Sequence, residues 1–233
     1  MPRSIWPIPE RMLLAVQLLG TAAVVACVPS NAVKTLVLPC WWFLTFRRFR
    51  LRELAVYLLV CGLFTVMDIL AVAHGTFVFD HPDFAGLPSY ELLLWGYYIL
   101  HAIRFLKPRA PAFSWGALLL AIPFAASFSC IEQPLTLLLV TAGVLGLGLV
   151  FNHERSTCAC MVYMILIGAV FEYGGVWSGQ WHYPHPPLGG VPPWFATLWG
   201  GVGFFTATLV LPLLTARSEP SRELFVAPDR RPC

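Results

Sequence analysis

The connection between two apolar segments of this chain reads Phe46-Arg47-Arg48-Phe49-Arg50-Leu51-Arg52-Glu53. It contains four arginines, and apolar residues 32–46 and 54–74 flank it. A basic cluster at the end of an apolar segment is typical of a cytoplasmic loop in a membrane protein, because Lys and Arg are retained on that side of the bilayer. This connection therefore marks the cytoplasmic side, and the side of every other connection can be assigned relative to it.

The composition of the 233-residue chain also indicates a membrane protein. Hydrophobic residues make up 58% of the chain and charged residues only 12%. A soluble domain carries about 25% charged residues, so this chain has too few to cover a water-facing surface. The net charge of +3 lies in short connections, and no nucleic-acid-binding motif accompanies it. We therefore expect no nucleic acid partner, and the absence of a phosphate-binding glycine loop argues against nucleotide-driven activity.

Apolar stretches between charged or Pro/Gly-rich breaks predict eight membrane-spanning helices. The candidate spans are residues 12–28, 32–46, 54–74, 90–106, 113–131, 134–151, 158–178 and 194–214. A helix needs about 20 residues to cross a bilayer and tolerates about 17. The second segment is short and contains Pro39, so the count becomes seven if that segment does not cross. The sequence thus predicts an all-α, polytopic transmembrane helix bundle as one domain over residues 1–214, followed by a poorly ordered cytoplasmic tail over residues 215–233.

The basic residues sort onto one side of the membrane once these segments are drawn. Of the fifteen Lys and Arg residues, only Lys34 falls on the opposite side. The positive-inside rule then predicts that both termini are cytoplasmic, in a bacterial inner membrane. The second segment is expected to cross, because otherwise Arg3 and Arg11 would lie outside. The stretch Val24-Val25-Ala26-Cys27 resembles a lipoprotein cleavage box, but we favour a first transmembrane helix over a cleaved signal peptide.

Two carboxylic acids lie deep within predicted spans. Asp68 and Glu172 each follow the start of a helix by about fourteen residues, which places both about 21 Å from the inner face. A charged side chain in hydrocarbon costs at least about 2.5 kcal/mol, so each is a candidate functional residue. Tyr98, or its neighbour Tyr97, and His101 on the fourth span are expected to converge with them. The alternative is that these groups pair only to hold helices together.

Glu172 belongs to a segment, residues 171–183, that is rich in glycine and aromatic residues. An acid in an apolar aromatic pocket stays protonated and can donate its proton, and aromatic faces stabilise a neighbouring cation. These properties suit acid-catalysed chemistry on an isoprenoid lipid that enters from the bilayer. Gly175 and Gly179 form a small-xxx-small pair that favours close helix packing. The rings expected to line a substrate pocket are Trp95, Trp177, Trp181, Tyr183 and Trp199.

A family resemblance rests on the same region. Glu172-x-x-Gly175-Val176-x-x-Gly179, followed by Tyr183, Gly190-Val191-Pro192 and Trp199, resembles the motif of bacterial carotenoid biosynthesis membrane proteins, the carotenoid hydratases. The resemblance covers residues 172–199 only, and Trp181-His182-Tyr183-Pro184-His185 departs from that family's pattern. It implies hydration or a related lyase or isomerase reaction on a carotenoid-like lipid, with Glu172 as the acid. The full catalytic set that we predict is Glu172, Asp68, His101 and Tyr98, without a cofactor.

Two alternatives to this membrane enzyme remain open. The first is a metal- or haem-binding protein, because imidazoles near acidic residues can bind Zn, Cu or Fe. Its ligands would be the histidines of the predicted outer face, namely His74, His81, His182 and His185. The second is a non-catalytic subunit or assembly factor of a larger membrane complex, which suits a small polytopic chain with short loops. We favour the enzyme at this stage.

Overall fold

The computed structural model describes residues 9–184 and 189–215, so the predicted tail lies almost wholly outside the described residues. The helices are α1 (Glu10–Cys27), α2 (Asn31–Phe46), α3 (Leu51–Ala73), α4 (Glu91–Leu106), α5 (Trp115–Cys130), α6 (Pro134–Phe151), α7 (Arg155–Trp177) and α8 (Phe195–Phe205). The last of these continues through a π-helical turn, η1 (Thr206–Val210), into α9 (Leu211–Thr215). Two short strands, β1 (Val78–Phe79) and β2 (Trp181–His182), pair antiparallel.

The all-α architecture predicted from hydropathy is confirmed. Each of the eight apolar segments coincides with a helix in the described part of the chain. Five helical stretches are long and apolar enough to cross a membrane, namely α1, α3, α6, α7 and the continuous α8–α9 stretch. The helix α5 is apolar but shorter, and α2 and α4 have 16 residues each. The chain is an integral membrane helix bundle.

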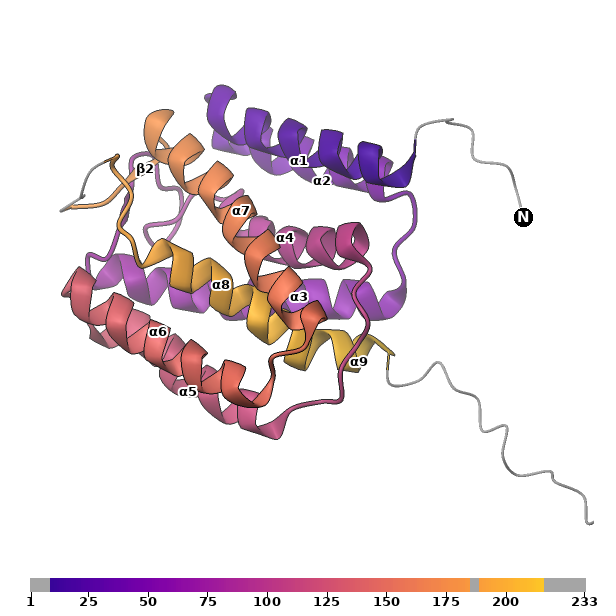
Figure 1. Cartoon of the computed structure of the whole chain (residues 1–233). Coiled ribbons are helices and arrows are strands. Elements are labelled where there is room, and N and C mark those ends of the chain that lie inside the picture. The colour runs from indigo at the N-terminus through magenta and orange to yellow at the C-terminus, as the bar shows by residue number, and fades with distance from the viewer. Residues whose placement is uncertain (1–8, 185–188, 216–233) are drawn as a thin grey trace, which may run out of the picture.

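Four helices form the centre of this bundle. Figure 1 shows α1 and α2 as a pair along one side and α5 and α6 as a pair along the other, with α3, α4, α7 and α8 between them. The pairs α7–α8 and α3–α4 are in extensive contact. Because successive helices alternate in direction, the end of α3 and the end of α7 lie at the same end of the bundle as the start of α4. We call this the hairpin end, after the strands β1 and β2.

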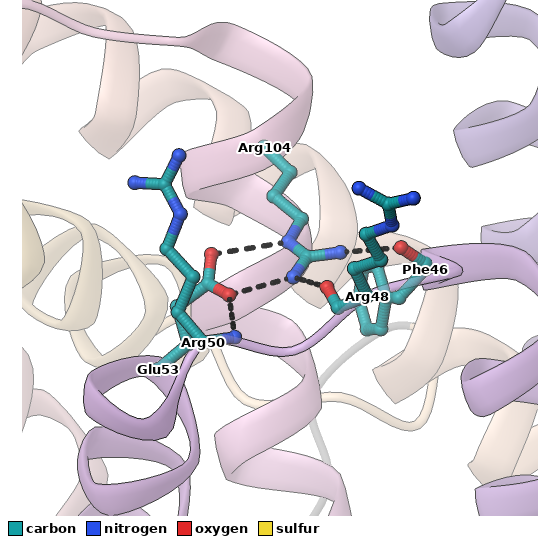
Figure 2. Close-up of polar contacts among 5 residues, drawn as sticks. All are labelled: Phe46, Arg48, Arg50, Glu53 and Arg104. Atoms are coloured by element: carbon teal, nitrogen blue, oxygen red, sulfur yellow. Dashed lines mark hydrogen bonds and ion pairs between the residues drawn. The ribbon is translucent and has the colours of Figure 1, made fainter. Parts of the chain in front are cut away.

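The opposite end, which carries the basic cluster of residues 46–53, is held by Arg104. Its guanidinium contacts both carboxylate oxygens of Glu53, at 2.8 and 3.4 Å, and donates to the carbonyls of Phe46 and Arg48 at 2.9 and 2.5 Å (Figure 2). Glu53 also accepts from the backbone N–H of Arg50, which caps the start of α3. Arg104 therefore ties α4 to the α2–α3 connection.

A cap of loops covers the hairpin end. The two-stranded ribbon joins the segment between α3 and α4 to the segment after α7, and the backbone N–H of Asp80 donates to the carbonyl of Gln180. From α2, the Asn31 side chain donates to the carbonyl of His81 at 2.7 Å. The ammonium of Lys34 bonds to Gln180 and lies 4.5 Å from the centre of the Tyr90 ring. Hydropathy gave no indication of this cap, because strands of two residues leave no periodic pattern.

Candidate functional site

A small cavity lies beneath the cap, between α3, α4, α7 and α8. Its volume is about 50 Å³. Three carboxylic acids line it, namely Asp68 on α3, Glu91 at the start of α4 and Glu172 on α7, and each is less than 9% exposed. The remaining lining is aromatic and aliphatic, from Phe77, Phe79, Trp95, Tyr98, Phe171, Trp181, Tyr183, Trp194, Leu198 and Trp199. We call it the acidic cavity.

Glu172 accepts three hydrogen bonds from the side chains around it. The Tyr183 hydroxyl donates to Oε2 at 2.6 Å and the Trp181 indole N–H donates to the same oxygen at 3.2 Å. The Trp199 indole N–H donates to Oε1 at 2.9 Å. Both oxygens of Glu172 are therefore engaged as acceptors, and donors of this kind stabilise the ionised carboxylate.

Two glycines on α7 make room for the indoles that reach Glu172. A Cβ added to Gly175 would lie 2.1 Å from Cη2 of Trp181, and a Cβ added to Gly168 would lie 2.2 Å from Cγ of Trp199. Residues three and four apart share one helix face, so Glu172 lies between the two rings. The predicted small-xxx-small pair is therefore wrong, because Gly175 faces an indole and Gly179 lies beyond α7 with a φ of +69°.

Asp68 and its neighbours form the second part of the cavity wall. The Trp95 indole N–H donates to Oδ2 of Asp68 at 2.8 Å. Trp95 packs against Trp199 with ring centres 5.0 Å apart, and Tyr98 packs edge-on to Trp199 at 4.9 Å. Thus α3 and α7 each supply a carboxylate, and α4 and α8 supply rings that contact one another between them.

Glu91 is a cavity residue that the sequence analysis did not select. Its side chain is 8% exposed and has no hydrogen-bond partner within the described residues. It interacts electrostatically with both Asp68 and Glu172. A carboxylate in the first turn of a helix is typical of a residue at the membrane rim, where it favourably faces the helix N-terminus. The cap buries this position, and the cap was not predictable.

His101 does not line the acidic cavity. It is fully buried nearer the basic end, where Nδ1 contacts Oε1 of Gln17 at 3.0 Å and Nε2 contacts the Tyr163 hydroxyl at 2.8 Å. Gln17 donates in turn to Thr45 at 2.6 Å, so this network joins α1, α2, α4 and α7. The expected convergence of His101 with the two carboxylates is therefore not found, since His101 lies one turn beyond the cavity-lining residues of α4.

Two of the other selected aromatic residues also lie away from the cavity. Trp177 is 75% exposed and its ring packs against Tyr173, so it faces the outside of the bundle. Tyr97 stacks on Trp42 with ring centres 4.5 Å apart, towards α2. Adjacent helix residues point in different directions, and this rotation separates Tyr97 from Tyr98.

The outer histidines do not form a metal cluster in the part of the chain that the structure describes. His182 pairs with Asp80 at 2.7 Å, and His81 contributes its backbone carbonyl to the cap. His74 lines a neighbouring cavity with Glu132. His185 lies outside the described residues. The requirement of three ligands around one point is not met by the histidines that can be placed.

No protein-family model matches this chain, and neither does any curated protein. Two solved structures match its fold, namely MvINS, a mycobacterial Insig homologue from Mycobacterium vanbaalenii, and a cross-linked MvINS trimer. Each match has a TM-score of 0.64 and 21% sequence identity, and covers 74% of this chain and 100% of the MvINS chain. The fold and the burial pattern together define a polytopic helical membrane protein with an Insig-like fold.

The resemblance to carotenoid hydratases is therefore wrong. The structures that match are those of an Insig homologue, and the match covers the whole MvINS chain. No family model supports a carotenoid enzyme. The residues that carried the resemblance have a structural explanation instead. Gly175 accommodates an indole ring, and Tyr183 and Trp199 hydrogen-bond to Glu172. Gly, Trp and Pro around a loop between two helices form a pattern that different helix bundles can share.

Proposed function

We propose that this chain is a non-catalytic membrane protein that acts by binding, as a component of a membrane assembly. The observation that carries this proposal is the engagement of Glu172 by three donors, at 2.6, 2.9 and 3.2 Å. An acid catalyst must present a proton to its substrate. Here both oxygens of the predicted acid accept hydrogen bonds from the protein's own side chains, so the group is suited to holding its neighbours in place.

The size of the acidic cavity supports the same conclusion. Sites for drug-sized ligands are typically about 300–1,000 Å³. The acidic cavity measures about 50 Å³, and its walls include Trp95, Trp181 and Trp199, each less than 9% exposed. The end of a polyene would require these rings to separate. The proposed site therefore recognises a small polar group and does not enclose an isoprenoid chain.

The likeness to the Insig homologue supports the proposed role in an assembly. The fold match extends over the whole MvINS chain, and a cross-linked MvINS trimer has been crystallised. We propose that this chain likewise associates with copies of itself or with other membrane proteins through its helix faces. Native mass spectrometry after gentle detergent extraction tests this point, and a strictly monomeric chain with no co-purifying membrane protein would contradict it.

Lipid analysis of the host separates the binding protein from an enzyme. The comparison uses wild-type cells, a deletion strain, and a strain that carries Glu172→Gln. We expect no isoprenoid precursor to accumulate in either altered strain. Accumulation of the same precursor in both, with Glu172→Gln expressed at the wild-type level, would overturn the proposal and restore a catalytic role for Glu172.

We also propose that eight helices cross the membrane with both termini in the cytoplasm. The support is the charge distribution, in which Lys34 alone lies on the outer side, together with the match between each apolar segment and a helix. A reporter fused to the C-terminus should give a cytoplasmic signal, and a reporter fused after α7 should give an external signal. Equal signals from the two fusions would contradict this topology.

A further inference from the structure

We propose that the acidic cavity binds the ammonium group of a short primary alkylamine, of the aminoethyl type. This inference rests on the proposed function, because it names the class of small polar group that the cavity would recognise. The ligand would place its N–H donors among Asp68, Glu91 and Glu172, with its first carbons against the surrounding rings. The inference rests on charge, unmet hydrogen bonding, ring geometry and size.

The acidic cavity contains acidic side chains and no basic one among its described lining residues. Three carboxyl groups line it, and the described lining includes no Lys, Arg or His. The three groups interact electrostatically with one another. Asp68 and Glu172 receive indole and hydroxyl donors, but neutral donors do not supply a positive charge. A bound cation would favour the ionised form of these carboxyl groups and offset the repulsion between them.

Glu91 marks the position where a donor is missing. Glu91 is only 8% exposed and lines the cavity. Its carboxyl group opens onto the cavity and accepts no hydrogen bond from the described residues, so it can accept one from a ligand or a water molecule. The ammonium group has three N–H donors and no acceptor, which complements three carboxyl groups.

The aromatic walls and the volume select the type of cation. The rings of Trp95, Tyr98 and Trp199 contact one another around the cavity, and aromatic faces attract organic cations. The volume of about 50 Å³ admits an ammonium group and a short carbon arm. The described residues contain no group of three acidic side chains close enough to hold one metal ion. An alkylamine fits this arrangement better, because it shares its contacts between carboxyl groups and aromatic rings.

The protein already contains one buried ammonium group next to an oxygen acceptor and an aromatic ring, that of Lys34 in the cap. Lys34 is 1% exposed, and its Nζ bonds to the side-chain carbonyl of Gln180 over the face of Tyr90. Tyr90 directly precedes Glu91. The cap thus shows that a buried ammonium is accommodated by one oxygen acceptor and one aromatic face, whereas the acidic cavity offers three carboxyl groups.

A route to the acidic cavity starts at the hairpin end. A second cavity of about 180 Å³ is lined by His74, Thr76 and Glu132, and it shares Tyr183 and Trp194 with the acidic cavity as common walls. An amine would enter from this end and pass the Tyr183–Trp194 boundary. The amine could come from a lipid headgroup or from a free solute, since both present the same aminoethyl chemistry.

The test is a fluorescence titration of the full-length protein in detergent. Ethylammonium chloride is added at constant ionic strength, with KCl and tetramethylammonium chloride as controls, and the cavity indoles report binding. We expect a saturable change with ethylammonium alone. Glu91→Gln should bind roughly tenfold or more weakly, because it removes a charge partner but keeps the shape. Glu154→Gln, which alters an exposed acid at the far end of α7, should bind like the wild type.

Three results would overturn the proposal: no saturable change, an equal change with KCl, or unaltered affinity in Glu91→Gln. Size-exclusion profiles and thermal midpoints establish that each variant is folded, and Asp68→Asn replaces Glu91→Gln if the latter does not fold. Repeating the titration in nanodiscs identifies the source of the amine. Phosphatidylethanolamine should weaken apparent ethylammonium binding relative to phosphatidylglycerol if the headgroup is the ligand, whereas equal binding in both assigns the site to a free amine.

Discussion

The substitution Gly175→Ala tests whether glycine on α7 exists to admit the ring of Trp181. The added Cβ would lie 2.1 Å from both Cη2 and Cζ2 of that ring, whereas ordinary contacts begin at 3.4 Å. The ring must therefore retreat by more than an ångström, and its 3.2 Å hydrogen bond to Glu172 would be lost. Overpacking costs about 1–3 kcal/mol, and a carboxylate deprived of a donor costs about 1–3 kcal/mol more.

The neighbouring glycine provides a matched control. A Cβ at Gly174 meets nothing within 4 Å, although Gly174 lies in the same turn of α7. Alanine is favoured over glycine in a helix by about 0.5–1 kcal/mol. We therefore expect Gly174→Ala to be neutral or slightly stabilising, and Gly175→Ala to lose about 1–5 kcal/mol after this propensity gain is included.

Thermal unfolding in detergent, followed by tryptophan fluorescence, measures both variants. For a chain of this length each kcal/mol shifts the midpoint by roughly 2–4 °C, so Gly175→Ala should unfold roughly 5–15 °C below Gly174→Ala. Its emission should also shift to the red as Trp181 leaves its buried position. Equal midpoints for the two variants would refute the argument that the indole requires a glycine beneath it.

Three further predictions concern the two ends of the bundle and the cavity. Glu53→Gln weakens the largely buried ion pair with Arg104 and should lower the free energy of unfolding by about 1.5–3 kcal/mol. Glu10→Gln, in the exposed pair with Lys107, should lower it by only about 0–1 kcal/mol. Equal losses for the two variants in denaturant titrations would contradict this contrast. Hydrogen bonds from the backbone N–H and hydroxyl of Ser89 lower the pKa of Asp83. Because the pKa of Asp83 is lower in the folded state than its unfolded value of about 4, this carboxylate stabilises the fold above that pH, and the stabilisation is lost as the pH falls. Asp83→Asn should therefore flatten the acid side of a plot of unfolding free energy against pH. An unchanged acid side would contradict this prediction. Tyr183→Phe removes the 2.6 Å bond to a buried carboxylate and should cost about 1–3 kcal/mol by thermal unfolding, while wild-type stability would show that this bond is not maintained.

Much of the fold was predictable because membrane helices are determined locally. A run of about 20 apolar residues satisfies its own backbone hydrogen bonds within hydrocarbon, so hydropathy alone locates it. The short second segment is a helix over Asn31–Phe46 despite Pro39, as its hydropathy predicted. The pairing of Arg104 with Glu53 and two carbonyls was not predictable, because snorkelling to the interface is an equally good local solution for an arginine at a helix end.

The candidate site was predictable only in part. Equal depth along two parallel helices brought out Asp68 and Glu172, and the structure places both at one cavity. The depth argument also selected His101, and closeness in sequence to Glu172 selected Trp177. Both face other directions, because neither argument gives the rotation of a residue around its helix axis. Glu91 was missed for the opposite reason, since its sequence position indicates a rim and only the cap above it makes it buried.

The amino-acid sequence by itself determined the class of protein, the approximate helix boundaries and the places of Asp68 and Glu172 along their helices. Each of these depends on the transfer of a segment from water to hydrocarbon, which is nearly additive along the chain. Only the tertiary structure shows which donors reach which carboxyl group. It also shows that glycines on α7 leave space for the indole rings from β2 and α8. Such contacts join residues far apart in the chain, as Glu172 and Trp199 show, and depend on how each helix is rotated against its neighbours. Hydropathy contains no information on that rotation.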